Sequence, residues 1–131
     1  MVNDRKNELA KTWFKAAEHD LDWAIGSLEL KKYAGVCFLS QQIVEKSLKA
    51  YLYSKNVELK KIHDLDSLLI EAIRFETELE KFKEVTATLS SYYLNTRYPD
   101  IGDIETFNNE DLAKQALGWA EEIYHYLKEK I

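Results

Sequence analysis

Cationic and hydrogen-bonding side chains in two stretches of this chain are of the types that bind a negatively charged ligand. One stretch carries Gln42, Lys46 and Lys49, and the other carries Arg97 and Asp100 on either side of the only proline. An arginine can grip a phosphate or a carboxylate with two parallel hydrogen bonds, and a lysine adds a point charge. These residue types therefore predict a site for a phosphate-bearing or carboxylate-bearing ligand.

Pro99 fixes the point at which the second stretch must leave helical geometry. Proline cannot continue a helix, and it pushes the residue before it, Tyr98, out of the helical region. We therefore expect Arg97, Tyr98 and Asp100 to lie in irregular backbone, where binding groups are common. A structural alternative is that Arg97 pairs with Asp100 or Asp20 and clamps this loop onto the rest of the molecule.

The first stretch is unusual because a narrow polar stripe runs along one face of a predicted helix that is otherwise apolar. The stripe has the i, i+3, i+4, i+7 spacing of one helix face and consists of Gln42, Glu45, Lys46 and Lys49. A helix that is apolar over most of its circumference lies at the centre of a bundle or in an oligomer interface. The stripe is then a solvated face, a polar groove or the seam of a symmetric dimer.

Two further polar residues each have a structural and a functional interpretation. Asp20 projects from the apolar face of the first predicted helix, where an acid is costly unless it is paired. It lies either at a wet edge of the bundle or opposite a cation from another helix. His63 precedes Asp64, a predicted helix N-cap, and is either a structural hydrogen-bonding group or part of the ligand site.

Helical periodicity accounts for nearly the whole chain, which has only four glycines and one proline in 131 residues. The apolar spacing predicts five helices, over 4–30, 33–55, 64–75, 78–95 and 109–129. Asp64 is expected to cap the third helix, and the fifth is expected to begin near Asn108. No repeat, low-complexity tract or linker interrupts the sequence, so residues 1–131 predict one all-α domain.

Composition disfavours several classes of protein. The net charge of −5 argues against a general nucleic-acid coat, because such binding relies on neutralising phosphates. No apolar run reaches the roughly 20 residues of a membrane span, and the amino terminus lacks the apolar core of a signal peptide. Cys37, the only cysteine, cannot form an internal disulfide. We therefore expect a cytoplasmic protein without a membrane segment.

The motifs of several kinds of catalysis are missing from the sequence. It has no glycine-rich phosphate loop, no HExxH or paired-cysteine metal site and no nucleophile elbow. The three histidines, His19, His63 and His125, show no ligand spacing. We expect neither a metal nor a cofactor.

Several segments together resemble the HEPN domain family. Their order and spacing extend over roughly residues 8 to 126, and they are Trp13–Ala17, Asp20–Leu21, Cys37–Ala50, His63–Leu65 and Arg97–Asp100. The stretch QQxxEKxLKA, followed by HDL and RYPD, is specific. The resemblance implies an all-α up-and-down bundle, here of four long helices plus one short helix. It also implies a homodimer and a small nucleotidyltransferase subunit as partner, often as a toxin–antitoxin module.

Many HEPN proteins are metal-independent ribonucleases, in which an arginine is followed four to six residues later by a histidine. The arginine would steady the phosphate, and the histidine would assist attack by the ribose 2′-hydroxyl. This sequence departs from that pattern. The positions where the histidine would follow Arg97 hold Gly102, Asp103 and Ile104. The tyrosine that receives adenylyl groups in toxin members is also missing, and RYPD is similar to the subgroup described as nucleotide-binding or as a nucleotidyltransferase accessory subunit.

The sequence therefore predicts a non-catalytic module that binds a nucleotide or another phosphate-bearing ligand. The expected ligand-binding residues are Gln42, Lys46, Lys49, His63, Arg97 and Asp100, supported by Asp20, Glu45 and Tyr98. The alternative is a ribonuclease toxin that acts on RNA with Arg97 and His63 as its catalytic pair. A third interpretation makes both polar clusters structural, with the partner bound through exposed helix faces.

Overall fold

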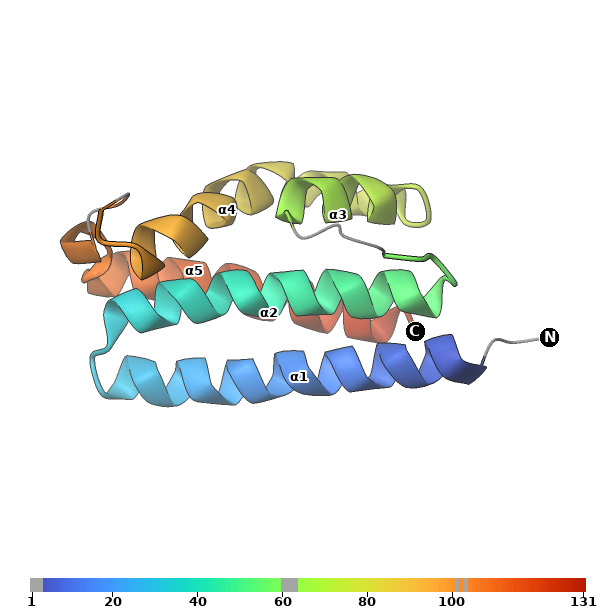
Figure 1. Cartoon of the computed structure of the whole chain (residues 1–131), viewed down its shortest axis with the longest axis horizontal. Helices are drawn as coiled ribbons and strands as arrows, with labels where there is room; N and C mark the ends of the chain where they lie inside the picture. Colours follow the sequence, from blue (N-terminus) through green and yellow to red (C-terminus); the bar gives the residue numbers. More distant parts are fainter. Residues whose placement is uncertain (1–3, 60–63, 101, 103) are drawn as a thin grey trace.

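The computed structural model describes residues 4–59, 64–100, 102 and 104–131, and these ranges are helical with no strand (Figure 1). The helices are α1 (Asp4–Glu29), α2 (Tyr33–Ser54), α3 (Leu65–Ile73), η1 (Thr77–Phe82), α4 (Lys83–Arg97), η2 (Ile104–Phe107) and α5 (Glu110–Glu129), where η1 and η2 are 3-10 helices. The predicted all-α class is confirmed, with α1, α2, α4 and α5 running alternately up and down.

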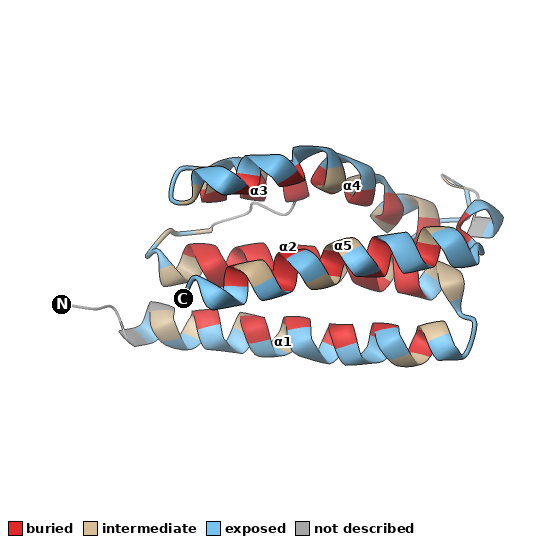
Figure 2. Cartoon of the chain, turned by 180° about the vertical axis from the view of Figure 1, so that it is seen from behind, coloured by how far each residue is buried: buried red, intermediate tan, exposed pale blue. Residues whose placement is uncertain are grey.

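Helix α2 is the centre of the bundle. It packs against α1, α3, α4 and α5, and 13 of its 22 residues are buried. Its apolar side chains around most of the circumference explain this position, because each neighbour covers a different part of its surface. Figure 2 shows buried residues on the inward sides of the helices and exposed residues outside. None of the helices in the described ranges is both long and apolar enough to cross a membrane.

Side-chain caps fix the start of two helices. The Asp64 carboxylate accepts a hydrogen bond from the Ser67 amide at 3.0 Å, which confirms the predicted cap of α3. The Asn109 side chain accepts one from the Leu112 amide at 3.0 Å, so α5 begins one residue later than a cap at Asn108 would place it. Both bonds satisfy amide groups that the first turn of a helix leaves unpaired.

The helix predicted over 78–95 is instead two elements. The chain forms η1 up to Phe82, and α4 begins at Lys83. Leu79 and Phe82 are both buried, and their three-residue spacing suits a 3-10 helix, in which side chains at i and i+3 lie directly above each other. The apolar spacing therefore located the segment correctly but not its geometry.

Helix α4 extends to Arg97, so the expectation that this arginine lies in irregular backbone was wrong. Proline restricts the residue immediately before it, and Tyr98 is indeed extended, with φ −123° and ψ 101°. Arg97, two residues before Pro99, keeps helical geometry and stands in the last turn of α4.

After Pro99 the chain folds back onto the end of α4. The Gly102 amide donates a hydrogen bond to the Tyr98 carbonyl at 3.0 Å. A Cβ atom at position 102 would fall inside contact distance of the Asn95 backbone. Only glycine allows this close approach without a movement of the backbone.

Candidate functional site

The polar stripe of α2 is divided between two neighbouring helices. Its lysines Lys46 and Lys49 face α1 and form, with their partners there, what we term the α1–α2 seam. Its amide and acid side chains line a hollow beside α3 and α4, which we term the α2–α4 cavity. The two sides have different electrostatics, because the seam contains ammonium groups and the cavity contains amides and carboxylates.

In the α1–α2 seam, Lys46 and Asp20 form an ion pair between the two helices. The Lys46 Nζ atom lies 2.6 Å from the Asp20 Oδ2 atom, and the two side chains are 23% and 11% exposed. Of the two interpretations of Asp20, the one that places it opposite a cation from another helix is confirmed. Removing two charged groups from water costs free energy, and the short charge-assisted hydrogen bond between them offsets this cost.

Lys49 is held in the same seam by a carboxylate and by an aromatic ring. Its Nζ atom lies 2.9 Å from the Glu45 Oε2 atom and 5.0 Å from the centroid of the Trp13 ring. The residue is only 6% exposed. A buried ammonium group requires such compensation, because it has given up most of its water. Lys49 therefore ties α1 to α2.

The α2–α4 cavity has a volume of about 530 Å³, within the range of small-molecule sites. Its lining is Gln41, Gln42, Glu45, Asp64, Leu65, Ser90, Tyr93 and Leu94. The Gln42 amide donates to the Gln41 side-chain oxygen at 2.7 Å, and the Gln41 amide donates to Glu45 at 3.4 Å. The amide groups are thus ordered in a row that ends at a carboxylate.

Both carboxylates of the α2–α4 cavity already have hydrogen-bond partners. The Glu45 carboxylate accepts hydrogen bonds from the side chains of Gln41 and Lys49. The Asp64 carboxylate accepts a hydrogen bond from the Ser67 amide. Hydrogen bonding to Ser67 lowers the pKa of Asp64 below its ordinary value of 3.8. Asp64 is therefore ionised at neutral pH, and the cavity suits the hydrogen-bond donors of a ligand more than a bare phosphate.

Arg97 is exposed at one end of this region and stacks on an aromatic pair. Its guanidinium carbon lies 4.8 Å from the centroid of the Phe38 ring, and the rings of Phe38 and Tyr93 are 5.8 Å apart. Tyr93 in turn lines the cavity. Among the described residues no carboxylate pairs with Arg97, and Asp20 is engaged by Lys46, so the clamp between Arg97 and Asp20 was a wrong interpretation.

The remaining predicted site residues fall into two groups. His63 lies outside the described residues. Tyr98 and Asp100 are exposed beyond the end of α4. In the ranges that the structure describes, no group of three or more His, Cys, Asp or Glu side chains is placed to hold a metal ion.

Sequence reasoning did not predict six of the eight residues that line the α2–α4 cavity, namely Gln41, Asp64, Leu65, Ser90, Tyr93 and Leu94. On α4, the residues Ser90, Tyr93, Leu94 and Arg97 share the i, i+3, i+4, i+7 spacing of one helix face. The same spacing identified the polar stripe of α2, so this signal was present in the sequence.

The family model described as HEPN domain matches residues 10–131. The crystal structure of TT1696 from Thermus thermophilus is 31% identical, covers 93% of this chain and 98% of its own, and has a TM-score of 0.83. The structure of ST0689, an archaeal HEPN homologue, is 28% identical, covers 92% and 96%, and has a TM-score of 0.75. No curated protein matches the chain.

Proposed function

This chain belongs to the HEPN domain family, and we propose that it is a non-catalytic module that binds a nucleotide or a related phosphate-bearing small molecule. The observation that carries the proposal is the position of Arg97. Its exposed guanidinium has no carboxylate partner among the described residues and is connected by the Phe38 and Tyr93 rings to the α2–α4 cavity. A planar cation in this position can grip a phosphate with two hydrogen bonds.

The two parts of the proposed ligand lie in different places, one inside the α2–α4 cavity and one at the end of the cavity near Arg97. The base and sugar occupy the α2–α4 cavity, where the Gln42 amide and the Glu45 carboxylate meet their donors and acceptors. The phosphate lies toward Arg97, away from the cavity carboxylates, which would repel it. Lys46 and Lys49 support the site by holding α2 against α1, and their charges offset those of their acidic partners.

The proposed setting is a homodimer that acts beside a small nucleotidyltransferase subunit, as in toxin–antitoxin pairs. Exposed apolar side chains support a role in protein contacts, since Trp23 is 67% exposed on α1 and Ile70 is 58% exposed on α3. Light scattering tests the dimer directly. A chain that is still monomeric at about 100 µM would contradict the homodimer. It would leave the proposed ligand site unaffected.

The ligand site is tested by titration calorimetry with ATP, GTP, CTP and UTP. We expect binding of at least one of them to the wild-type chain, and a loss of about tenfold or more in Arg97→Ala, because a hydrogen bond to a charged group is removed. Arg74→Ala is the matched control. Arg74 is also exposed and also lies over a ring, 5.9 Å from the Phe75 centroid, but it follows α3 as its C-cap residue and pairs with Glu71.

The calorimetric outcomes separate clearly. Binding that is lost in Arg97→Ala and kept in Arg74→Ala supports the proposed site. Equal heats from the wild-type chain and Arg97→Ala, or heats from neither, would remove it. Equal losses in both variants would mean that only the net charge of the chain matters.

A further inference from the structure

A second cavity lies between the amino-terminal half of α1 and the carboxyl-terminal end of α5, and it shares no residue with the α2–α4 cavity. Its volume is about 570 Å³, again in the range of small-molecule sites. Its lining is Asn7, Ala10, Lys11, Phe14, Lys15, Glu18, Tyr124, Lys128 and Ile131. None of these residues contributes to the function proposed above, so the two sites can be tested separately.

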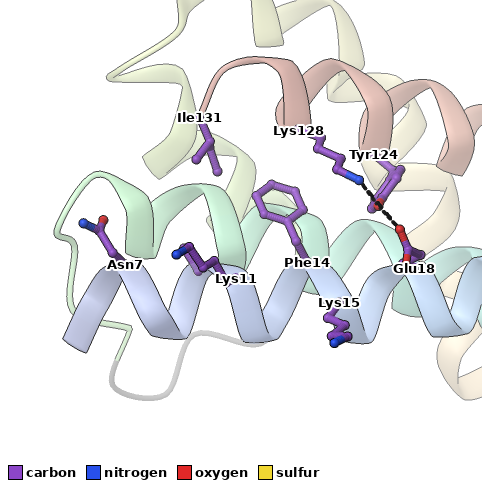
Figure 3. Close-up of a pocket in the computed structure, with 9 residues that line it drawn as sticks. Asn7, Lys11, Phe14, Lys15, Glu18, Tyr124, Lys128 and Ile131 are labelled. Atoms are coloured by element: carbon purple, nitrogen blue, oxygen red, sulfur yellow. Dashed lines mark hydrogen bonds and ion pairs between the residues drawn. The ribbon is translucent and has the colours of Figure 1, made fainter. Parts of the chain in front are cut away.

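Apolar groups form the body of this cavity. Figure 3 shows Phe14 rising from α1 toward the end of α5, with Tyr124 and Ile131 on either side of it. The Phe14 and Tyr124 rings meet edge to face, with centroids 6.1 Å apart and planes at 74°. The aliphatic stems of the lysines extend this apolar surface toward solvent. An apolar ligand body of modest size therefore finds contact on both helices.

The charged groups around the cavity are mainly cations. Three lysines and one glutamate line it, whereas the whole chain has 18 basic and 23 acidic residues. The single acid, Glu18, is already engaged, because it accepts from the Tyr124 hydroxyl at 3.3 Å and lies 3.6 Å from the Lys128 Nζ atom. The cavity is thus a local positive region on an acidic protein.

The three lysines differ in how strongly they are held by hydrogen bonds and ion pairs within the chain. The Lys128 Nζ atom donates to the Tyr124 hydroxyl at 3.2 Å, a bond that raises the pKa of Lys128 and keeps it protonated. Lys11 pairs with Glu8 at 3.6 Å, but both side chains are more than 70% exposed, so this pair is weak. In Figure 3 Lys15 points away from Phe14. Exposed lysines reorient within nanoseconds, so Lys11 and Lys15 can turn toward an anion at the rim.

We propose that the α1–α5 cavity is a binding site for small amphipathic organic anions. The ligand places an aromatic or short aliphatic body against Phe14 and Tyr124. Its carboxylate, sulfonate or phosphate group lies between Lys11 and Lys128. A neutral molecule of the same shape gains the apolar contact alone, so the negative charge sets the affinity.

The test uses 1-anilinonaphthalene-8-sulfonate, an aromatic anion whose fluorescence rises on binding, and the neutral N-phenyl-1-naphthylamine, which has the same rings without the sulfonate. We expect the anion to bind one site on the wild-type chain. Lys11→Glu/Lys15→Glu is expected to weaken its binding by about tenfold while changing the affinity for the neutral molecule by less than about twofold. Circular dichroism checks that the variant remains helical.

A matched variant separates a local site from a general effect of charge. Lys83→Glu/Lys114→Glu makes the same change in net charge at two exposed lysines, which pair with Glu80 at 3.3 Å and Glu110 at 3.8 Å. Neither lysine lines the α1–α5 cavity. This variant is expected to bind the anion as the wild-type chain does.

Amide chemical shifts locate the bound anion. Perturbations centred on Ala10, Phe14 and Tyr124 support the proposal. No binding to the wild-type chain, equal losses in the two double variants, or perturbations centred on another surface would overturn it. Failure here leaves the nucleotide site untouched, because that site is tested through Arg97 with a different ligand.

Discussion

The two sides of α2 use the same kinds of residue for different purposes. On the side facing α1, Lys46 and Lys49 are sheltered and each ammonium group has a carboxylate within 2.9 Å. On the side facing α4, Arg97 is exposed and rests on the Phe38 ring, with no acidic partner among the described residues. A cation that is buried and paired holds helices together, whereas one that is exposed and supported by a ring remains available to a ligand.

The difference has a physical basis in desolvation. A buried ammonium group has lost its water, so removal of its carboxylate leaves an uncompensated charge. The Arg97 guanidinium keeps its water, and its contact with Phe38 contributes little to folding. The α1–α2 seam and the α4 end should therefore respond differently to substitution: the seam in stability, and the α4 end in binding.

The largest expected effect is in the α1–α2 seam. Lys46→Met leaves the Asp20 carboxylate sheltered and unpaired, and it should lower the free energy of unfolding by about 2 kcal/mol, somewhat less than for a fully buried pair. Urea unfolding measures the change. Lys83→Met, which removes a lysine from the exposed pair with Glu80, should cost less than about 0.5 kcal/mol. Equal costs would mean that burial of the Asp20–Lys46 pair is unimportant.

A smaller effect is expected at the cap of α3, which borders the α2–α4 cavity. Asp64→Ala removes the hydrogen bond to Ser67 and should cost about 1 kcal/mol at neutral pH. Because the pKa of Asp64 is lower in the folded chain, this stabilisation is complete above the ordinary pKa of 3.8 and is lost as the pH falls through the folded value.

The control for this cap is Asn109→Ala at the start of α5, where the hydrogen bond to Leu112 is also 3.0 Å long. The asparagine side chain does not titrate, so the loss of unfolding free energy in Asn109→Ala should be the same at every pH. Unfolding curves at pH 7 and pH 3 would show the gap between the wild type and Asp64→Ala shrinking in acid. A gap that widens in acid would contradict the assigned ionisation.

At the end of α4 the effect on stability should be smaller still. Arg97→Ala is expected to change the free energy of unfolding by less than about 0.5 kcal/mol, because the side chain is exposed and only its ring contact is lost. Thermal unfolding measures it beside the calorimetric titrations. A loss of about 2 kcal/mol would make Arg97 a structural residue like Lys46, and the contrast between the two sides of α2 would disappear.

No measurable effect is expected on RNA. Single-stranded RNA incubated with the wild-type chain in EDTA should remain intact, because none of the three positions where the histidine would follow Arg97, from 102 to 104, holds a histidine. Gel electrophoresis of labelled RNA measures this. Cleavage that disappears in both Arg97→Ala and His63→Ala would favour the ribonuclease alternative.

Much of the fold was predictable because apolar spacing and capping residues act locally. The predicted range 33–55 agrees with α2 (Tyr33–Ser54), and Asp64 caps α3 as its position before an apolar run indicated. Asp20 was identified as anomalous because an acid on an apolar face requires a partner. The identity of that partner, Lys46, depends on how α1 and α2 pack, which the sequence of neither helix contains.

The candidate site was less predictable than the fold. The stripe on α2 was visible, but position around the helix axis does not decide which neighbour a side chain meets, because Lys49 falls in angle between Gln42 and Glu45 and yet faces α1. Lys46 and Gln42 are therefore neighbours on one helix with different surroundings. Tyr93 shares one face of α4 with Arg97, which the spacing shows, but that this face meets α2 and not another helix follows from tertiary packing.

The close approach at Gly102 also bears on how this chain can evolve. Position 102 is one of the positions at which ribonucleases of this family would carry their histidine, yet any side chain there would collide with the Asn95 backbone. A single codon change to histidine would therefore have to displace the turn that follows Pro99 before it could restore a catalytic pair. A histidine at this one position therefore requires a concerted rearrangement of the turn, so the packing of Gly102 against α4 narrows where this chain could gain such a side chain.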